Sequence, residues 1–181
     1  MPRYFAFLRA INVGGRNVTM EALRAHFEAA GMSDVQTFIA SGNVIFTSRS
    51  ARADALQDRI ETHLRAALGY EVRTFIRTGR ELDAIARLAP FSPLNVKSAK
   101  ALVVGFLSEP LGAEPRRALM ALTTDIDKFH VDGREVYWLC RKRQGESTFS
   151  NMVFEKKVGA SVTFRGMNTV TKLADRYVRV E

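Results

Sequence analysis

Residues 4–16 read YFAFLRAINVGGR and pass from an apolar strand into a loop that contains Asn12, two glycines and Arg16. Both alternating sets of side chains in YFAFL are apolar, so we expect this strand to lie inside a sheet with both faces covered. The two glycines can take positive φ and lead the chain towards an amphipathic helix at residues 20–30. The sequence therefore predicts a central strand followed by a strand-to-helix loop.

The rest of the first half continues this pattern. Ser41, Gly42 and Asn43 form a short turn sequence between two β-rich segments and predict a hairpin. The expected elements are strands at 35–40 and 44–48, a helix at 52–68 and a strand at 70–76. This order, βαββαβ, is the ferredoxin-like arrangement.

A connecting helix and a linker lead into the second half, which repeats this order of elements. Thr78 and Glu81 have the spacing of a capping box and open a helix that should end before Pro90. Residues 91–100 form the best linker candidate in the chain. The elements expected after it are a strand at 101–107, a helix at 114–122, hairpin strands at 126–131 and 135–140, a helix at 149–158, a strand at 161–164 and a helix at 168–178.

The predicted fold is α+β, with two ferredoxin-like (βαββαβ) units from an internal structural duplication and helices packed on mainly antiparallel sheets. The first unit, residues 1–90, includes the connecting helix, and the second spans residues 91–181. We expect the two to form one compact structural domain, since 181 residues with 46% hydrophobic content can build a sizeable core.

The net charge of +8 and the pI near 10.1 favour phosphate-rich partners, although an excess of Arg and Lys is also an ordinary solubility device. Cys140 is the single cysteine and lies in the apolar run VYWLC, which predicts a buried, inert thiol in a reducing compartment. We expect a cytoplasmic protein without a membrane partner, because no apolar run reaches the length of a membrane span. The oligomeric state is left open.

Three groups of polar residues are candidate ligand sites. Asn12 and Arg16 lie in the first glycine loop, where backbone N–H groups before a helix can hold an anion. Neither a P-loop nor a G-x-G-x-x-G motif is present there, so a plain strand-to-helix turn is the alternative. Ser41 and Asn43 form the second group, for which turn chemistry is the alternative.

The third group, Arg165, Asn168 and Lys172, gives the strongest functional signal in the chain. We expect Asn168 to cap the last helix, with both cations beside the helix N-terminus, where an anion would be stabilised. The alternative is a solvated charged surface with a helix cap.

The sequence predicts no metal and no cofactor. His26, His63 and His130 lie in different predicted elements, and no His or Cys stands at ligand spacing from another. No paired carboxylates and no activated nucleophile can be identified either, so no catalytic residue is predicted.

The chain resembles the bacterial domain-of-unknown-function family 1697. The resemblance rests on FLRAINVGGRNVTMEALR at 7–24, FIASGNVIF at 38–46, VYWLC at 136–140 and TFRGMNTVTKL at 163–173. It implies a cytoplasmic bacterial α+β protein and contributes no catalytic residue, because the family has no established activity. The ending departs from the family pattern, which would place an Asn and an aromatic residue where Gly166 and Met167 follow Arg165.

Two functions from different classes fit these observations. The first is a binder of nucleic acid or of a nucleotide-like anion, since RNA-recognition sheets share this architecture. However, SGNVIFTS at 41–48 matches the RNP1 motif poorly. The second is an enzyme acting on a small phosphorylated or carboxylated substrate in a cleft between the two units. A structural or interaction protein is the third possibility, and fold analogy cannot separate the three.

Overall fold

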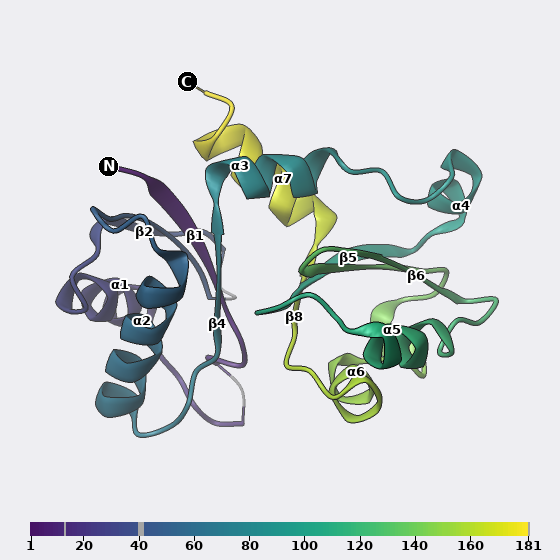
Figure 1. The fold of residues 1–181 in the computed structure, drawn as a ribbon, viewed down its shortest axis with the longest axis horizontal. Helices are drawn as coiled ribbons and strands as arrows, with labels where there is room; N and C mark the ends of the chain where they lie inside the picture. The colour runs from purple at the N-terminus through teal and green to yellow at the C-terminus, as the bar shows by residue number, and fades with distance from the viewer. Residues whose placement is uncertain (13, 40–41, 181) are drawn as a thin grey trace. The chain divides into compact units, whose positions relative to one another are not determined.

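The computed structural model describes residues 1–12, 14–39 and 42–180, which form two compact α+β units (Figure 1). The first unit comprises residues 1–83 together with 173–181, and the second comprises residues 84–172. Each unit contains a four-stranded sheet in which all neighbouring strands are antiparallel. The predicted α+β class and antiparallel sheets are confirmed.

The first sheet has the strand order β2-β3-β1-β4, so the opening strand lies inside it as predicted. Helices α1 and α2 both lie against one face of this sheet (Figure 1). The elements of this part are β1 (Arg3–Leu8), α1 (Met20–Ala29), β2 (Ser33–Thr37), β3 (Asn43–Thr47), α2 (Ala53–Leu68) and β4 (Thr74–Thr78).

Strand β1 is buried on both faces because its side chains alternate between two apolar environments. One set packs into the helix-covered core with the apolar residues of α1 and α2. The other set, Phe5 and Phe7, is equally buried on the opposite face, where the Phe5 ring lies 6.4 Å from the ring of Tyr177. The core of the helix-covered face includes Tyr4, Ala6, Leu8, Leu23, Phe27, Leu56, Ile60 and Leu64.

Several predicted boundaries are confirmed by local chemistry. Thr19 caps α1, since its Oγ1 accepts a hydrogen bond from the Ala22 N–H at 3.0 Å. Gly69 ends α2 in the left-handed conformation, at φ +81°. The fourth strand, however, begins at Thr74 rather than at residue 70. Its pairing with β1 ends near that point, where the Arg9 N–H donates to the Arg73 carbonyl.

The second unit repeats the arrangement of the first. Its sheet has the order β6-β7-β5-β8, which is the order of the first sheet with every strand number raised by four. Helices α5 and α6 lie on one face of it (Figure 1). The elements are β5 (Ala101–Phe106), α5 (Ala113–Met120), β6 (Asp127–Asp132), β7 (Glu135–Cys140), a 3-10 turn η1 (Gln144–Glu146), α6 (Asn151–Val158) and β8 (Thr163–Gly166).

The correspondence between the sheets extends to single residues. The Leu8 N–H donates to the carbonyl of Gly42 just before β3, and the Leu107 N–H donates to the carbonyl of Arg134 just before β7. Counting strand partners from these bonds shows that Arg77 of β4 and Arg165 of β8 have equivalent positions in their respective sheets.

Arg77 and Arg165 also make the same kind of hydrogen bond, each within its own strand. Each guanidinium donates through Nη1 to the carbonyl of its own preceding residue, and both distances are 2.9 Å. Two units with this likeness are what an internal duplication would leave, and the duplication itself stays a prediction.

Between β4 and β5 the chain forms α3 (Gly79–Arg87) and α4 (Pro93–Ser98), and the last helix is α7 (Met167–Tyr177). Helix α4 lies inside residues 91–100, the segment that we expected to be a linker. Ser92 caps it, with Oγ accepting from the Asn95 N–H at 3.3 Å, and Pro93 starts its first turn. A serine followed by proline is a helix-start signal that the linker interpretation overlooked.

Strand β7 is buried along its length, and this burial raises the pKa of two of its side chains. Cys140 is fully buried, and burial raises the pKa of its thiol. The Tyr137 hydroxyl lies 3.4 Å from the Ile85 carbonyl. Burial also raises the pKa of Tyr137, and the carboxylates of Glu135 and Asp132 raise it further.

We expect Cys140 to react slowly with thiol reagents in the native protein. Its thiol is inaccessible and its thiolate is disfavoured by burial, so both requirements for attack are missing. Labelling with a chromogenic disulfide reagent should proceed at the rate at which the protein opens and become fast and stoichiometric in urea. Rapid labelling without denaturant would contradict the buried position.

We expect the free energy of unfolding to fall as the pH rises above about 10, in part because of Tyr137. The unfolded chain loses this proton near the ordinary value of 10.0, whereas the folded chain retains it. The folded state then binds more protons, and each further pH unit costs up to about 1.4 kcal/mol. Urea unfolding at pH 8 and pH 10.5 should show a smaller loss for Tyr137→Phe than for the parent, and equal losses would refute the assignment.

Candidate functional site

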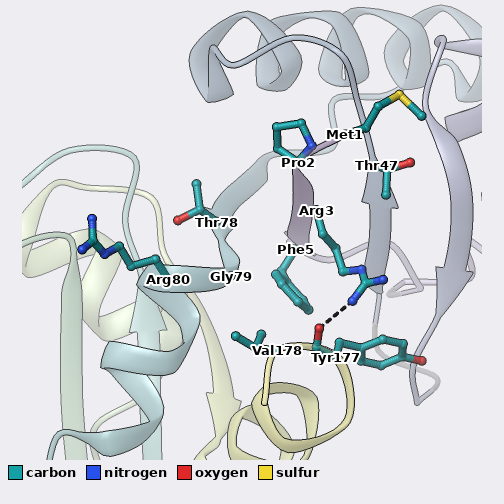
Figure 2. Close-up of a pocket in the computed structure, with 10 residues that line it drawn as sticks. All are labelled: Met1, Pro2, Arg3, Phe5, Thr47, Thr78, Gly79, Arg80, Tyr177 and Val178. Carbon is teal, nitrogen blue, oxygen red and sulfur yellow. Dashed lines mark hydrogen bonds between the residues drawn. The ribbon is translucent and has the colours of Figure 1, made fainter. Parts of the chain in front are cut away.

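A cavity of about 410 Å³ lies in the first unit, at the start of β1, the start of α3 and the end of α7 (Figure 2). Its size is in the range of pockets that hold small molecules. The described residues that line it are Met1, Pro2, Arg3, Phe5, Thr47, Thr78, Gly79, Arg80, Tyr177 and Val178.

One wall is fixed by the contact between Arg3 and the end of α7. The Arg3 guanidinium donates through Nη1 to the Tyr177 carbonyl at 2.6 Å, as the dashed line in Figure 2 marks. A cation at the C-terminal end of a helix is stabilised by the unsatisfied carbonyls there. The Tyr177 ring is held in turn by edge contacts with Phe5 and Phe38 and by its hydroxyl near Gln36 Oε1.

The opposite wall is the turn from β4 into α3, and it is fixed by the predicted capping box. The Thr78 N–H donates to Glu81 Oε2 at 2.8 Å, and the Glu81 N–H donates to Thr78 Oγ1 at 3.2 Å. Both donors at this helix start are therefore satisfied reciprocally. Thr78 and Gly79 present this ordered turn to the cavity (Figure 2).

The lining is cationic and partly apolar. Arg3 and Arg80 are its charged side chains, and none of the described lining residues is acidic. The carboxylates of Asp34 and Glu81 adjoin it but are engaged by the hydroxyls of Thr47 and Thr78.

The two arginines of the lining are placed differently. The Arg80 side chain extends away from Arg3 (Figure 2). Among the described residues its guanidinium has no hydrogen-bond or ion-pair partner. The Phe5 ring and the side chain of Val178 lie between the two arginines and supply apolar surface (Figure 2).

Asn12 and Asn43 lie at the other end of β1 from this cavity. Asn12 is exposed, and its Oδ1 accepts from the Val18 N–H at 2.7 Å, which closes the glycine loop. Asn43 is buried, and its Nδ2 donates to the Phe38 carbonyl at 2.9 Å. Both side chains line a small recess, so the structure brings the two loops together there.

The other two candidate residues of these loops are Arg16 and Ser41. Arg16 is exposed, and its guanidinium stacks 4.1 Å from the centre of the Tyr70 ring, a cation–π contact. Ser41 lies outside the described residues. Gly42, beside it, is required by packing, because a Cβ there would lie 2.9 Å from Ile11 Cγ2.

In the second unit, Arg165 is partly buried on β8 and donates through Nη1 to Thr163 Oγ1 at 2.8 Å. Burial lowers the pKa of Arg165 to about 10, so the side chain remains a cation at neutral pH. Asn168 is the second residue of α7 rather than its cap, because β8 runs directly into the helix at Met167. Asn168 and Lys172 are both exposed.

Sequence comparison places the chain in a family. The profile of the family described as "Protein of unknown function (DUF1697)" matches residues 1–137. The chain belongs to this family. No curated protein matches it.

The family assignment confirms the resemblance, and one solved structure extends the comparison to the fold. The conserved bacterial protein SP0830 from Streptococcus pneumoniae is similar, with a TM-score of 0.71 and 21% identity over 96% of this chain and 97% of that chain. At this identity the likeness supports the fold alone.

Membrane-spanning helices and metal-ligand clusters are both absent from the described part of the chain. No helix there is long and apolar enough to cross a membrane. Within the same residues, no three His, Cys, Asp or Glu side chains are grouped as metal ligands would be.

Sequence reasoning did not find the cavity in Figure 2. The residues that form it are far apart in the sequence: Arg3 begins the first strand, and the Thr78–Glu81 capping box was interpreted only as a helix start. The third contribution, the end of α7, comes from about 100 residues further along the chain. Only the folded unit brings the three together.

We expect Thr78→Ala to lower the free energy of unfolding by about 1 kcal/mol, because an N-cap hydroxyl satisfies a backbone donor at the start of α3. The midpoint of urea unfolding measures the change. Thr62→Ala, at an exposed position inside α2, is the matched control and should be neutral or slightly stabilising. Equal effects of the two substitutions would show that the capping box contributes nothing.

Proposed function

We propose that this protein binds a small organic anion of nucleotide size in the first-unit cavity. The observation that carries the proposal is a cavity of about 410 Å³ with two arginines, two threonines and no acidic side chain among its described lining residues. Such a lining favours a phosphate or carboxylate over a neutral or cationic ligand. The net charge of +8 also attracts anionic ligands to the protein at longer range.

The chemistry of the lining supports a ligand with two different parts. Arginine presents planar N–H donors that match the oxygens of a carboxylate or phosphate, which suits Arg3 and Arg80 to the anionic part. Pro2 and Val178 offer an apolar surface to a ring or an alkyl group. A nucleotide or a similar phosphorylated ring compound has this combination.

The buried state of the strand aromatics favours a small anion over single-stranded RNA. RNA-recognition sheets stack bases on exposed aromatic side chains. Here Phe5, Phe7, Tyr137 and Trp138 are all at most 3% exposed, so these four rings cannot act as such a platform.

An enzyme acting on a phosphorylated or carboxylated substrate is the alternative. Such an enzyme would need an acid, a base or a nucleophile beside the bound substrate. The described lining contains no Asp, Glu, His, Cys or Lys side chain. Binding is therefore the function that this geometry supports best.

The test is calorimetric titration with AMP, ATP and inorganic phosphate at low ionic strength. Arg80→Gln should weaken binding by about ten- to a hundredfold, the value of one charge-assisted hydrogen bond, and added salt should weaken binding to the parent. Arg24→Gln, at an exposed position of α1, is the matched control and should leave the affinity unchanged.

The second-unit prediction is tested in the same titrations. The Arg165→Ala, Lys172→Ala double variant should retain binding if the cavity is the site. Loss of binding in that variant alone would transfer the site to the second unit and overturn the cavity proposal. Absence of binding to all three anions at millimolar concentration would overturn the proposal of a nucleotide-sized anion.

A further inference from the structure

The second unit contains a cavity of about 400 Å³ of different character. Its floor is aromatic, formed by Trp138, Phe149 and Phe164, and its rim carries the uncharged polar side chains of Gln144, Ser150 and Asn151. None of the described residues that line it carries a formal charge. This lining excludes the anion chemistry proposed for the first unit.

The aromatic floor is a packed cluster rather than a set of loose side chains. The Phe149 ring lies 4.7 Å from the ring of Trp138 and 6.1 Å from that of Phe164, both in edge-to-face geometry. Trp138 and Phe149 are 3% exposed each, whereas Phe164 keeps a partly exposed surface. A ligand would therefore meet mainly the partly exposed ring of Phe164, which Trp138 and Phe149 hold in place from behind.

A buried carboxylate fixes the rim to the sheet. Asp127 is 2% exposed, and it accepts hydrogen bonds from Trp138 Nε1 at 2.8 Å and from Ser147 Oγ at 2.7 Å. Ser147 Oγ in turn accepts from the Phe149 N–H at 3.0 Å. The segment that carries the rim is thus tied to β6 and β7, which pre-organises the cavity.

The rim has hydrogen-bonding capacity that the fold does not use. Among the described residues, the carboxamides of Gln144 and Asn151 have no hydrogen-bond partner. Ser150 Oγ accepts from the Val153 N–H at 3.2 Å and retains its own hydrogen as a donor. Carboxamides offer a donor and an acceptor side by side, the pattern that the edge of a nucleobase or similar heterocycle complements.

We propose that this cavity binds an uncharged, planar heteroaromatic ring of nucleobase size. The ring would lie against the exposed surface of Phe164, and its polar edge would hydrogen-bond with Gln144 and Asn151. This inference goes beyond the anion proposal because it concerns another unit, other residues and a ligand without charge.

The single tryptophan of the chain gives a direct readout, because Trp138 lines the cavity. Adenosine, an uncharged nucleoside, should change the Trp138 emission in a saturable manner. Asn151→Ala should weaken adenosine binding by about five- to tenfold through loss of one hydrogen bond. Asn17→Ala, which removes an exposed amide in the first unit, is the matched control and should bind as the parent does.

A second variant blocks the cavity without removing a contact. Gly145 lines the cavity, and a Cβ built on it meets no atom within 4 Å, so Gly145→Leu should fold normally and occupy the ligand's space. Adenosine binding should then be lost, while the unfolding midpoint is retained.

Three outcomes would overturn the proposal. The first is an unchanged adenosine affinity in both Asn151→Ala and Gly145→Leu, and the second is no change in emission with the parent at millimolar adenosine. The third is an equal response to ribose, which has hydroxyls but no aromatic ring. None of these outcomes bears on the anion proposal, since adenosine carries no charge.

Discussion

The pairing of one apolar strand between two others is the interaction on which each unit depends. Strand β1 is hydrogen-bonded to β3 on one side and β4 on the other, and β5 has the same position between β7 and β8. A strand in that position satisfies its backbone groups within the sheet, so both faces can be buried without losing hydrogen bonds. The order of the other elements then follows, because each helix must cross back over the sheet to reach the next strand.

Much of this architecture could be predicted from the sequence because the signals are local. Continuous apolar runs predicted β1, β5 and β7, and glycines or capping residues marked ends of α1 and α2. The predicted element boundaries that were wrong lie where tertiary contacts determine the local structure. The start of β4 is set by pairing with β1, and Ser92 and Pro93 started a helix inside an apparent linker.

The candidate sites were harder to predict because polar residues have structural uses that sequence cannot separate from functional ones. Asn43 is of a residue type that is common in turns, yet its side chain is buried and donates a hydrogen bond to the Phe38 carbonyl. Trp138 was expected only as part of a strand and Phe149 only as the start of a helix, since nothing in the sequence reveals that the two border a cavity. Arg3 and Arg80 are separated by three strands and two helices and become neighbours of one cavity only through folding.

The order in which the chain contributes to its units has a consequence for biosynthesis. The second unit, residues 84–172, is interposed within the first, whose last part is residues 173–181. On the ribosome the first sheet can form early, but Tyr177, which fixes Arg3 and packs on Phe5, emerges only after the second unit has been made. The first-unit cavity is therefore completed only after the second unit has been made, although most of its strands are synthesised first.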